Sequence, residues 1–118
     1  MKIDKTRKIK QIDGKSDKLI PQQRLDDEGK PTVDMVTISM EEILLGVLTN
    51  PAGVTEETTG REIVGRVVLS ERIFKAKKMV EVSEEEVKML KTLIERLCRD
   101  PILMTGARRI LGIPDEEE

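Results

Sequence analysis

Four helix starts follow one another from residue 39 onward, and they constrain the fold more than any other feature of this chain. Each begins with a Ser, Thr or Asp side chain that can accept a hydrogen bond from an amide two or three residues further on. These N-cap residues are Ser39, Thr59, Ser83 and Asp100. Apolar residues then recur at spacings of three and four, as on one face of an amphipathic helix. The pattern predicts four helices between residues 39 and 112.

Further local signals support these helices and place their ends. Three of the four N-cap residues are followed three positions later by a glutamate, which is typical of a capping box. Pro101 directly follows Asp100, at the first helical position, where a proline costs no backbone hydrogen bond. We expect the first helix to end near Thr49, the second near Lys78 and the fourth at Gly112.

The second helix carries a broad apolar stripe, which we expect to lie in the core. The stripe runs along Ile63, Val67, Ser70 and Phe74 and is widened by Val64, Val68, Leu69 and Ile73. Many of these residues are β-branched, so tertiary packing has to hold this helix together. Gly65 weakens the helix by about 1 kcal/mol relative to alanine. Close packing against a neighbouring helix is the expected reason for a glycine at that position, and a kink in the helix is the alternative.

The N-terminal residues have a different pattern, which predicts β-structure. Asp13-Gly14 is a typical two-residue hairpin turn, because both positions tolerate positive φ. The returning strand is expected to begin at Leu19-Ile20 and to stop at Pro21. Residues 22–32 are polar and contain a glycine and a proline, which predicts a loop. A short strand is then expected from Val33 to Ile38.

Composition limits what the core can be made of. The 118 residues suffice for one hydrophobic core, and they include one Phe, no Tyr and no Trp. The core is therefore expected to consist of Ile, Leu, Val and Met, without an aromatic platform for stacking ligands. The predicted fold is α+β, mainly α, with an N-terminal β-hairpin and short strands followed by a small four-helix bundle. The expected divisions are a basic β-type section (1–38), a helical domain (39–112) and an acidic disordered tail (113–118).

Catalysis by the chain's own side chains is not expected. Histidine is absent, and Cys98 is the only cysteine, placed on an apolar helical face as a buried structural thiol. The glutamates at 84–86 are interpreted as helix capping and the acids at 26–28 as a solvated turn. We predict a non-enzymatic protein with no catalytic residue, no cofactor and no metal site. A lone thiol and no run of about 20 apolar residues favour a cytoplasmic protein outside the membrane.

Charge is unevenly distributed along the chain. Residues 1–24 hold eight basic and three acidic residues, a local balance of +5, whereas the last four residues are all acidic. Solvation is the favoured interpretation, and a nucleic-acid arm or a contact between copies is the alternative. The candidate nucleic-acid or partner contacts are Lys5, Arg7, Lys8, Lys10, Lys15, Lys18, Arg108 and Arg109.

A succession of short motifs resembles that of small uncharacterised phage and prophage accessory proteins. The motifs are Asp13-Gly14, Val36-Thr37-Ile38, Ile43-Leu44-Leu45, Thr59-Gly60-Arg61-Glu62, Leu69-Ser70-Glu71-Arg72-Ile73, Val80-Glu81-Val82-Ser83, Gly106 and Ile110-Leu111. The chain departs from the pattern at residues 99–102, where an aromatic-proline step is expected. The resemblance implies an accessory role by protein contact, in virion assembly or against a host machine, inside the host cell or in the virion. It implies no site residues.

The leading functional hypothesis is therefore a protein that acts by contact with another protein or with itself. Its helices have more apolar surface than three short helices can hide among themselves, so a groove or an edge strand is expected to receive a partner. A homo-oligomer would also cover this surface. The alternative is a nucleic-acid-associated regulator that uses the basic N-terminal section. A carboxylate and metal hydrolase is the least favoured hypothesis.

Overall fold

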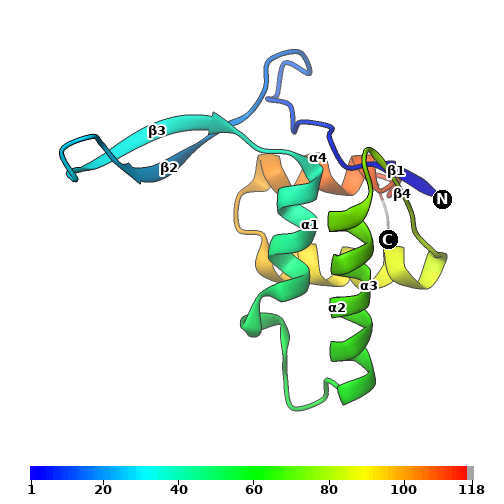
Figure 1. Ribbon diagram of the computed structural model, residues 1–118. Helices are drawn as coiled ribbons and strands as arrows, with labels where there is room; N and C mark the ends of the chain where they lie inside the picture. The colour runs from blue at the N-terminus through cyan, green and yellow to red at the C-terminus, as the bar shows by residue number, and fades with distance from the viewer. Residues whose placement is uncertain (117–118) are drawn as a thin grey trace.

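The computed structural model describes residues 1–116 and shows in them four helices and a few short antiparallel strands, most of them near the N-terminus, which confirms the α+β, mainly α, fold. The strands are β1 (Lys2–Asp4), β2 (Leu19–Leu25), β3 (Pro31–Thr37) and β4 (Met79–Glu81). The helices are α1 (Met40–Thr49), α2 (Gly60–Lys75), α3 (Glu84–Leu97) and α4 (Pro101–Ile110), with a 3-10 turn η1 (Pro51–Gly53). The helices cluster into one body, and the β2–β3 hairpin extends away from it (Figure 1).

All four predicted N-caps are present. The Ser39 hydroxyl accepts from the amide of the third residue of α1 at 3.4 Å, and Thr59 does the same for α2 at 3.2 Å. At α3 the complete capping box forms, because Ser83 accepts from the Glu86 amide and Glu86 accepts from the Ser83 amide. The Asp100 carboxylate accepts from two amides of α4. These local contacts explain why the helix starts could be predicted.

Helix α1 lies at the centre of an aliphatic core. It packs against α2, α3 and α4. The most deeply buried side chains are Ile3, Ile9, Met40, Leu44, Leu69, Ile73, Val80, Val82, Leu90, Leu93, Ile94 and Leu111. The prediction of a core built without aromatic residues is confirmed.

Helix α2 buries a different face from the one expected. Its buried residues are Arg66, Leu69, Ser70 and Ile73, whereas Phe74 is 71% exposed. The prediction that the whole stripe lies in the core is wrong. The apolar residues of α2 occupy two sides of the helix, and only one side faces α1.

The N-terminus is part of the helical body. β1 pairs with β4 in an antiparallel arrangement that places Ile3 opposite Val80. Ile3 and Ile9 are both buried in the core. The segment around Val80, between α2 and α3, is thus the strand that ties the first residues of the chain to the body.

The main hairpin lies later in the sequence than predicted. Asp13-Gly14 does reverse the chain, but only an isolated bridge between Lys10 and Asp17 forms there. The longer hairpin pairs Leu19 with Thr37 and continues to Leu25 and Pro31. The predicted loop over 22–32 and the predicted strand end at Pro21 are wrong. Each strand of a two-stranded sheet has a free edge, where a proline is tolerated.

The hairpin turn is made by Asp26 and Gly29. The Asp26 carboxylate accepts from the amides of Glu28 and Lys30, at 2.9 and 2.8 Å. Gly29 has a φ of 79°, which residues with a Cβ rarely adopt. These contacts connect β2 to β3 through residues 26–30, which have no apolar side chain.

The start of the acidic tail contacts the body. Ile113 is buried, and its amide donates to the carbonyl of Arg108. Asp115 forms an ion pair with Arg109 at 2.8 Å. Residues 117–118 of the tail predicted to be disordered lie outside the described residues.

Gly106 and Gly65 are expected to respond oppositely to alanine. A Cβ at Gly106 would lie 2.6 Å from Cγ2 of the buried Ile9. A Cβ at Gly65 would meet nothing within 4 Å, so the predicted close packing there is wrong. We expect Gly106→Ala to lower the free energy of unfolding by about 1–2 kcal/mol through overpacking, and Gly65→Ala to raise it by up to about 1 kcal/mol. Urea denaturation measures both, and a stabilised Gly106→Ala variant would contradict the close contact.

Glu86 is expected to make stability depend on pH. Burial raises its pKa, but the Ser83 amide and the Arg72 guanidinium, 2.8 Å away, outweigh burial and lower the pKa below its ordinary value. A lowered pKa contributes stability above the ordinary value of about 4.3 and loses it as pH falls through the folded pKa. We expect Glu86→Gln to cost about 0.5–1 kcal/mol at pH 7 and nothing at pH 2. Denaturation across pH, with the exposed Glu85→Gln as control, measures this; an equal cost at both pH values would contradict it.

Candidate functional site

The β2–β3 hairpin, here called the arm (residues 19–37), has one uncovered apolar face. Side chains alternate between the two sides of a strand, and paired residues point to the same side. The register puts eight residues on one side, two of which, Gln23 and Thr37, are polar. The six apolar ones, here called the arm face, are Leu19, Pro21, Leu25, Pro31, Val33 and Met35. All six are exposed, with Leu25 at 68% and Val33 at 60%. Sequence reasoning missed this face, although the alternation in 31–35 was a signal for it.

The other side of the arm is polar beyond its base. Gln22 pairs with Asp34, and Arg24 pairs with Thr32. Arg24 and Asp34 also form an ion pair across the strands. A two-stranded hairpin is only marginally stable in water by itself. The arm thus presents apolar side chains and two unpaired strand edges where the body gives it little support.

Helix α2 presents a second uncovered apolar surface. This α2 stripe consists of Ile63, Val64, Val67, Val68 and Phe74, all of them exposed. Ile63, Val67 and Phe74 fall on one line along the helix, with Val64 and Val68 beside them. The exposed Glu71 lies on the same face, between Val67 and Phe74. The stripe borders the face that packs on α1, because the buried Ser70 lies three residues after Val67 and four before Phe74.

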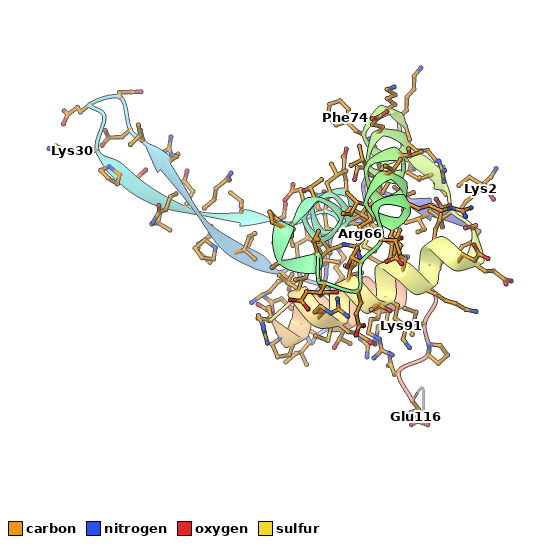
Figure 2. All side chains as sticks on the ribbon, turned by 90° about the horizontal axis from the view of Figure 1, so that it is seen from below. Lys2, Lys30, Arg66, Phe74, Lys91 and Glu116 are labelled. Atoms are coloured by element: carbon orange, nitrogen blue, oxygen red, sulfur yellow. The ribbon has the colours of Figure 1, made fainter. Side chains whose placement is uncertain are left out.

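Opposite charges stand at one end of each surface. The arm turn carries the acidic residues 26–28, of which Glu28 forms an ion pair with Lys30 at 3.5 Å, so the turn as a whole remains acidic. The C-terminal end of α2, next to Phe74, is followed by the exposed lysines Lys75, Lys77 and Lys78. The acidic turn and this lysine cluster belong to different ends of the molecule, as the positions of Lys30 and Phe74 in Figure 2 show.

Lys5, a predicted partner contact, is instead a buried structural residue. Its ammonium donates to the Glu41 carboxylate and to the Ile73 carbonyl, both at 3.0 Å, and to the Phe74 carbonyl at 3.3 Å. These carbonyls lie in the last turn of α2, where positive charge is favoured. The prediction of Lys5 as a nucleic-acid or partner contact is wrong, because its ammonium is buried and already donates to groups within the protein.

Several other predicted basic residues are paired with acidic ones. The pairs are Lys10 with Asp17, Lys18 with Asp100, Arg108 with Glu95, and Arg109 with Asp115. The Asp115 carboxylate raises the pKa of Arg109, while the guanidinium lowers the pKa of Asp115. Lys15 lies exposed beside the Asp13 turn, where its amide donates to the Asp13 carboxylate. These ion pairs neutralise much of the positive charge that would attract the phosphate backbone of a nucleic acid.

The structure brings four of the predicted residues together at one groove. Arg7, Lys8 and Lys10 line it from the N-terminal segment, and Arg109 lines it from α4. Its volume is about 530 Å³, and its other lining residues include Ile12, Ile102 and Ile110. No ion pair of Arg7 or Lys8 is seen within residues 1–116. The groove combines apolar walls with a cationic rim.

The thiol and the carboxylates are the other side chains to consider as candidates for chemistry. Cys98 is half-buried, and burial raises the pKa of its thiol, which disfavours the reactive thiolate. Over residues 1–116, no three Cys, Asp or Glu side chains cluster as a metal site would require. In the same range, no helix combines the length and apolarity needed to cross a membrane.

No protein-family model, curated protein or solved structure matches this chain. The function proposed below therefore rests on the surfaces of the molecule.

Proposed function

We propose that this chain is a non-enzymatic protein that acts by protein–protein contact, with the arm as its binding element. The observation that carries the proposal is the arm face. Six exposed apolar side chains are gathered on one side of a hairpin that leaves the body. A monomer gains nothing from exposing such a surface, whereas a partner that covers it gains apolar burial.

The backbone of the arm supports the same role. Both strands of the hairpin have a free edge, and an extended segment of a partner can add to such an edge by backbone hydrogen bonds. The partner would also complete a sheet that is marginal with two strands. Binding would thereby stabilise the arm itself.

Within this class, the resemblance to phage and prophage accessory proteins supports a role in virion assembly or as an adaptor or inhibitor of a host protein. A location in the host cytoplasm or in the virion belongs to that proposal. Both remain predictions.

Site-specific photocrosslinking in cells of the source organism tests the proposal. A photoreactive residue at Met35, on the arm face, is expected to give a covalent adduct with a protein. The same residue at Gln22, on the polar side of the arm, is the matched control and is expected to give far less adduct. Adducts from neither position, or equal adducts from both, would contradict the proposal.

A second candidate is nucleic-acid binding, which the cationic groove favours. Arg7, Lys8, Lys10 and Arg109 line that groove together. Binding there would weaken steeply with salt, and neutralising one phosphate-binding side chain would reduce the salt slope by about 1. Measurement of binding to a duplex and a single strand between low and high salt, with Arg7→Gln and Lys8→Gln, tests it. Binding that is undetectable at low salt would exclude this candidate.

A further inference from the structure

We infer that the arm of one copy of this chain seats its apolar face on the α2 stripe of a second copy. This inference rests on the proposed function and names the partner. Three properties of the two surfaces support it, namely apolar character, length and charge.

The arm face and the α2 stripe both expose apolar side chains that a contact would bury. The arm face and the α2 stripe are the two gathered sets of exposed large apolar side chains within residues 1–116, apart from scattered single residues. The stripe is ridged by β-branched side chains, and the arm face is a flat pleated surface whose Met35 is adaptable in packing. A helix laid on a sheet face is a common way to bury both.

The lengths of the two surfaces are similar. The arm face runs from Leu19 to Leu25 along a seven-residue strand, which at about 3.3 Å per residue is roughly 20 Å long. The stripe runs from Ile63 to Phe74, which at about 1.5 Å per residue is roughly 17 Å. The arm is thus long enough to cover the whole stripe.

Charge gives the contact a direction. With the acidic turn at 26–28 placed over Lys75, Lys77 and Lys78, the base of the arm falls near Ile63. The reverse direction leaves the acidic turn away from these lysines. Charges at the rim of an interface mainly set orientation and partner choice.

The arm cannot use the α2 stripe of its own chain. In Figures 1 and 2 the arm leaves the body on the far side of α1 from α2. The close contacts of β2 and β3 are with each other, and α2 packs on α1. The stripe within reach of an arm is that of another molecule, and a reciprocal exchange closes the assembly at two copies.

Two double variants test the arm face and the α2 stripe one at a time. Val33→Thr with Met35→Thr makes the arm face polar while keeping residues that suit a strand. Val64→Gln with Phe74→Gln makes the stripe polar with residues that suit a helix. The control is Gln22→Thr on the polar side of the arm. Mass is measured by light scattering over a wide concentration range, and circular dichroism verifies folding.

The expected result is that wild type and the control reach twice the 13.4 kDa of the chain, while both variants remain monomeric. A mixture of the two variants is expected to form a one-to-one dimer. In that mixture one chain keeps an intact arm and the other keeps an intact stripe, so one contact can form. A dimer in the mixture that neither variant forms alone cannot arise from arm-to-arm pairing.

A charge exchange tests the direction of the contact. Lys75→Glu with Lys77→Glu is expected to weaken association at least tenfold. Adding Asp27→Lys with Glu28→Lys to the same chain is expected to restore it. Failure of the second pair to restore association would overturn the proposed direction.

The remaining outcomes distinguish the inference from the proposed function. If the arm variant is monomeric but the stripe variant still dimerises, the arm binds another surface; the inference is overturned and the proposed function stands. If wild type is monomeric at every concentration, the inference is overturned, and the Met35 adduct decides the proposed function. An adduct with a different protein retains that function, and the absence of any protein adduct removes it.

Discussion

Replacing Lys5 with methionine is expected to lower the free energy of unfolding by about 2–3 kcal/mol. Methionine keeps the length and apolar stem of the side chain but removes the ammonium. The Glu41 carboxylate and the carbonyls of Ile73 and Phe74 then lose their shared donor. Because Lys5 is 7% exposed, water replaces that donor poorly. Urea denaturation at pH 7 measures the loss.

A matched control is Lys8→Met, which removes an exposed positive charge from the same segment and is expected to change stability by less than about 0.5 kcal/mol. Adding Glu41→Gln to Lys5→Met is expected to recover part of the loss, since a neutral amide is easier to leave unpaired than a carboxylate. A loss below about 1 kcal/mol for Lys5→Met would show that this ammonium contributes far less than its burial indicates.

Removal of the arm is expected to abolish self-association and leave the body folded. Ile20 and Val36 are paired residues near the base of the arm, so a two-residue Asn-Gly turn can join them in place of residues 21–35. We expect the free energy of unfolding to change by less than about 1 kcal/mol, because the removed residues are mostly exposed. Association should weaken at least about 100-fold, which corresponds to about 2.7 kcal/mol.

Light scattering and denaturation of the same preparation measure both parts of this result. The Gln22→Thr chain, with its arm intact, is the reference for both. A shortened chain that still dimerises would place the interface on the body. A shortened chain that does not fold would show that the arm stabilises the core, contrary to its exposure.

The helices could be predicted from sequence because their determinants are local. The Ser83 capping box and the Asp100-Pro101 start involve residues at most three positions apart. The arm could not be predicted in the same way, because residues 22–32 lack a hydrophobic run. Its strands are held together by their pairing with each other and by the turn at Asp26 and Gly29. That turn can be recognised as a hairpin turn only when both paired strands are known.

The candidate site was predictable only in part, because its properties depend on which elements meet. The surplus of apolar helical surface was expected, but the side of α2 left uncovered depends on how α2 packs on α1. The basic residues could be counted from sequence, yet Lys5 is buried because the chain after β1 brings it between the start of α1 and the end of α2, where it donates to Glu41 and to the Ile73 carbonyl. Arg7 and Arg109 line one groove because distant parts of the chain meet.

The pairing of β1 with β4 has a consequence for the order of folding during synthesis. Ile3 pairs with Val80, and Ile9 packs against Gly106, so both contacts need residues that are synthesised late. The helical body can therefore fold completely only when nearly the whole chain has been made. The arm needs only residues 19–37 and, although it is marginally stable alone, it can form much earlier because its contacts are short-range. A nascent chain therefore carries an exposed apolar hairpin before it has an α2 stripe. Neighbouring ribosomes on one mRNA would hold such nascent chains close together. Early contact between their arms would then compete with the contact between an arm and an α2 stripe.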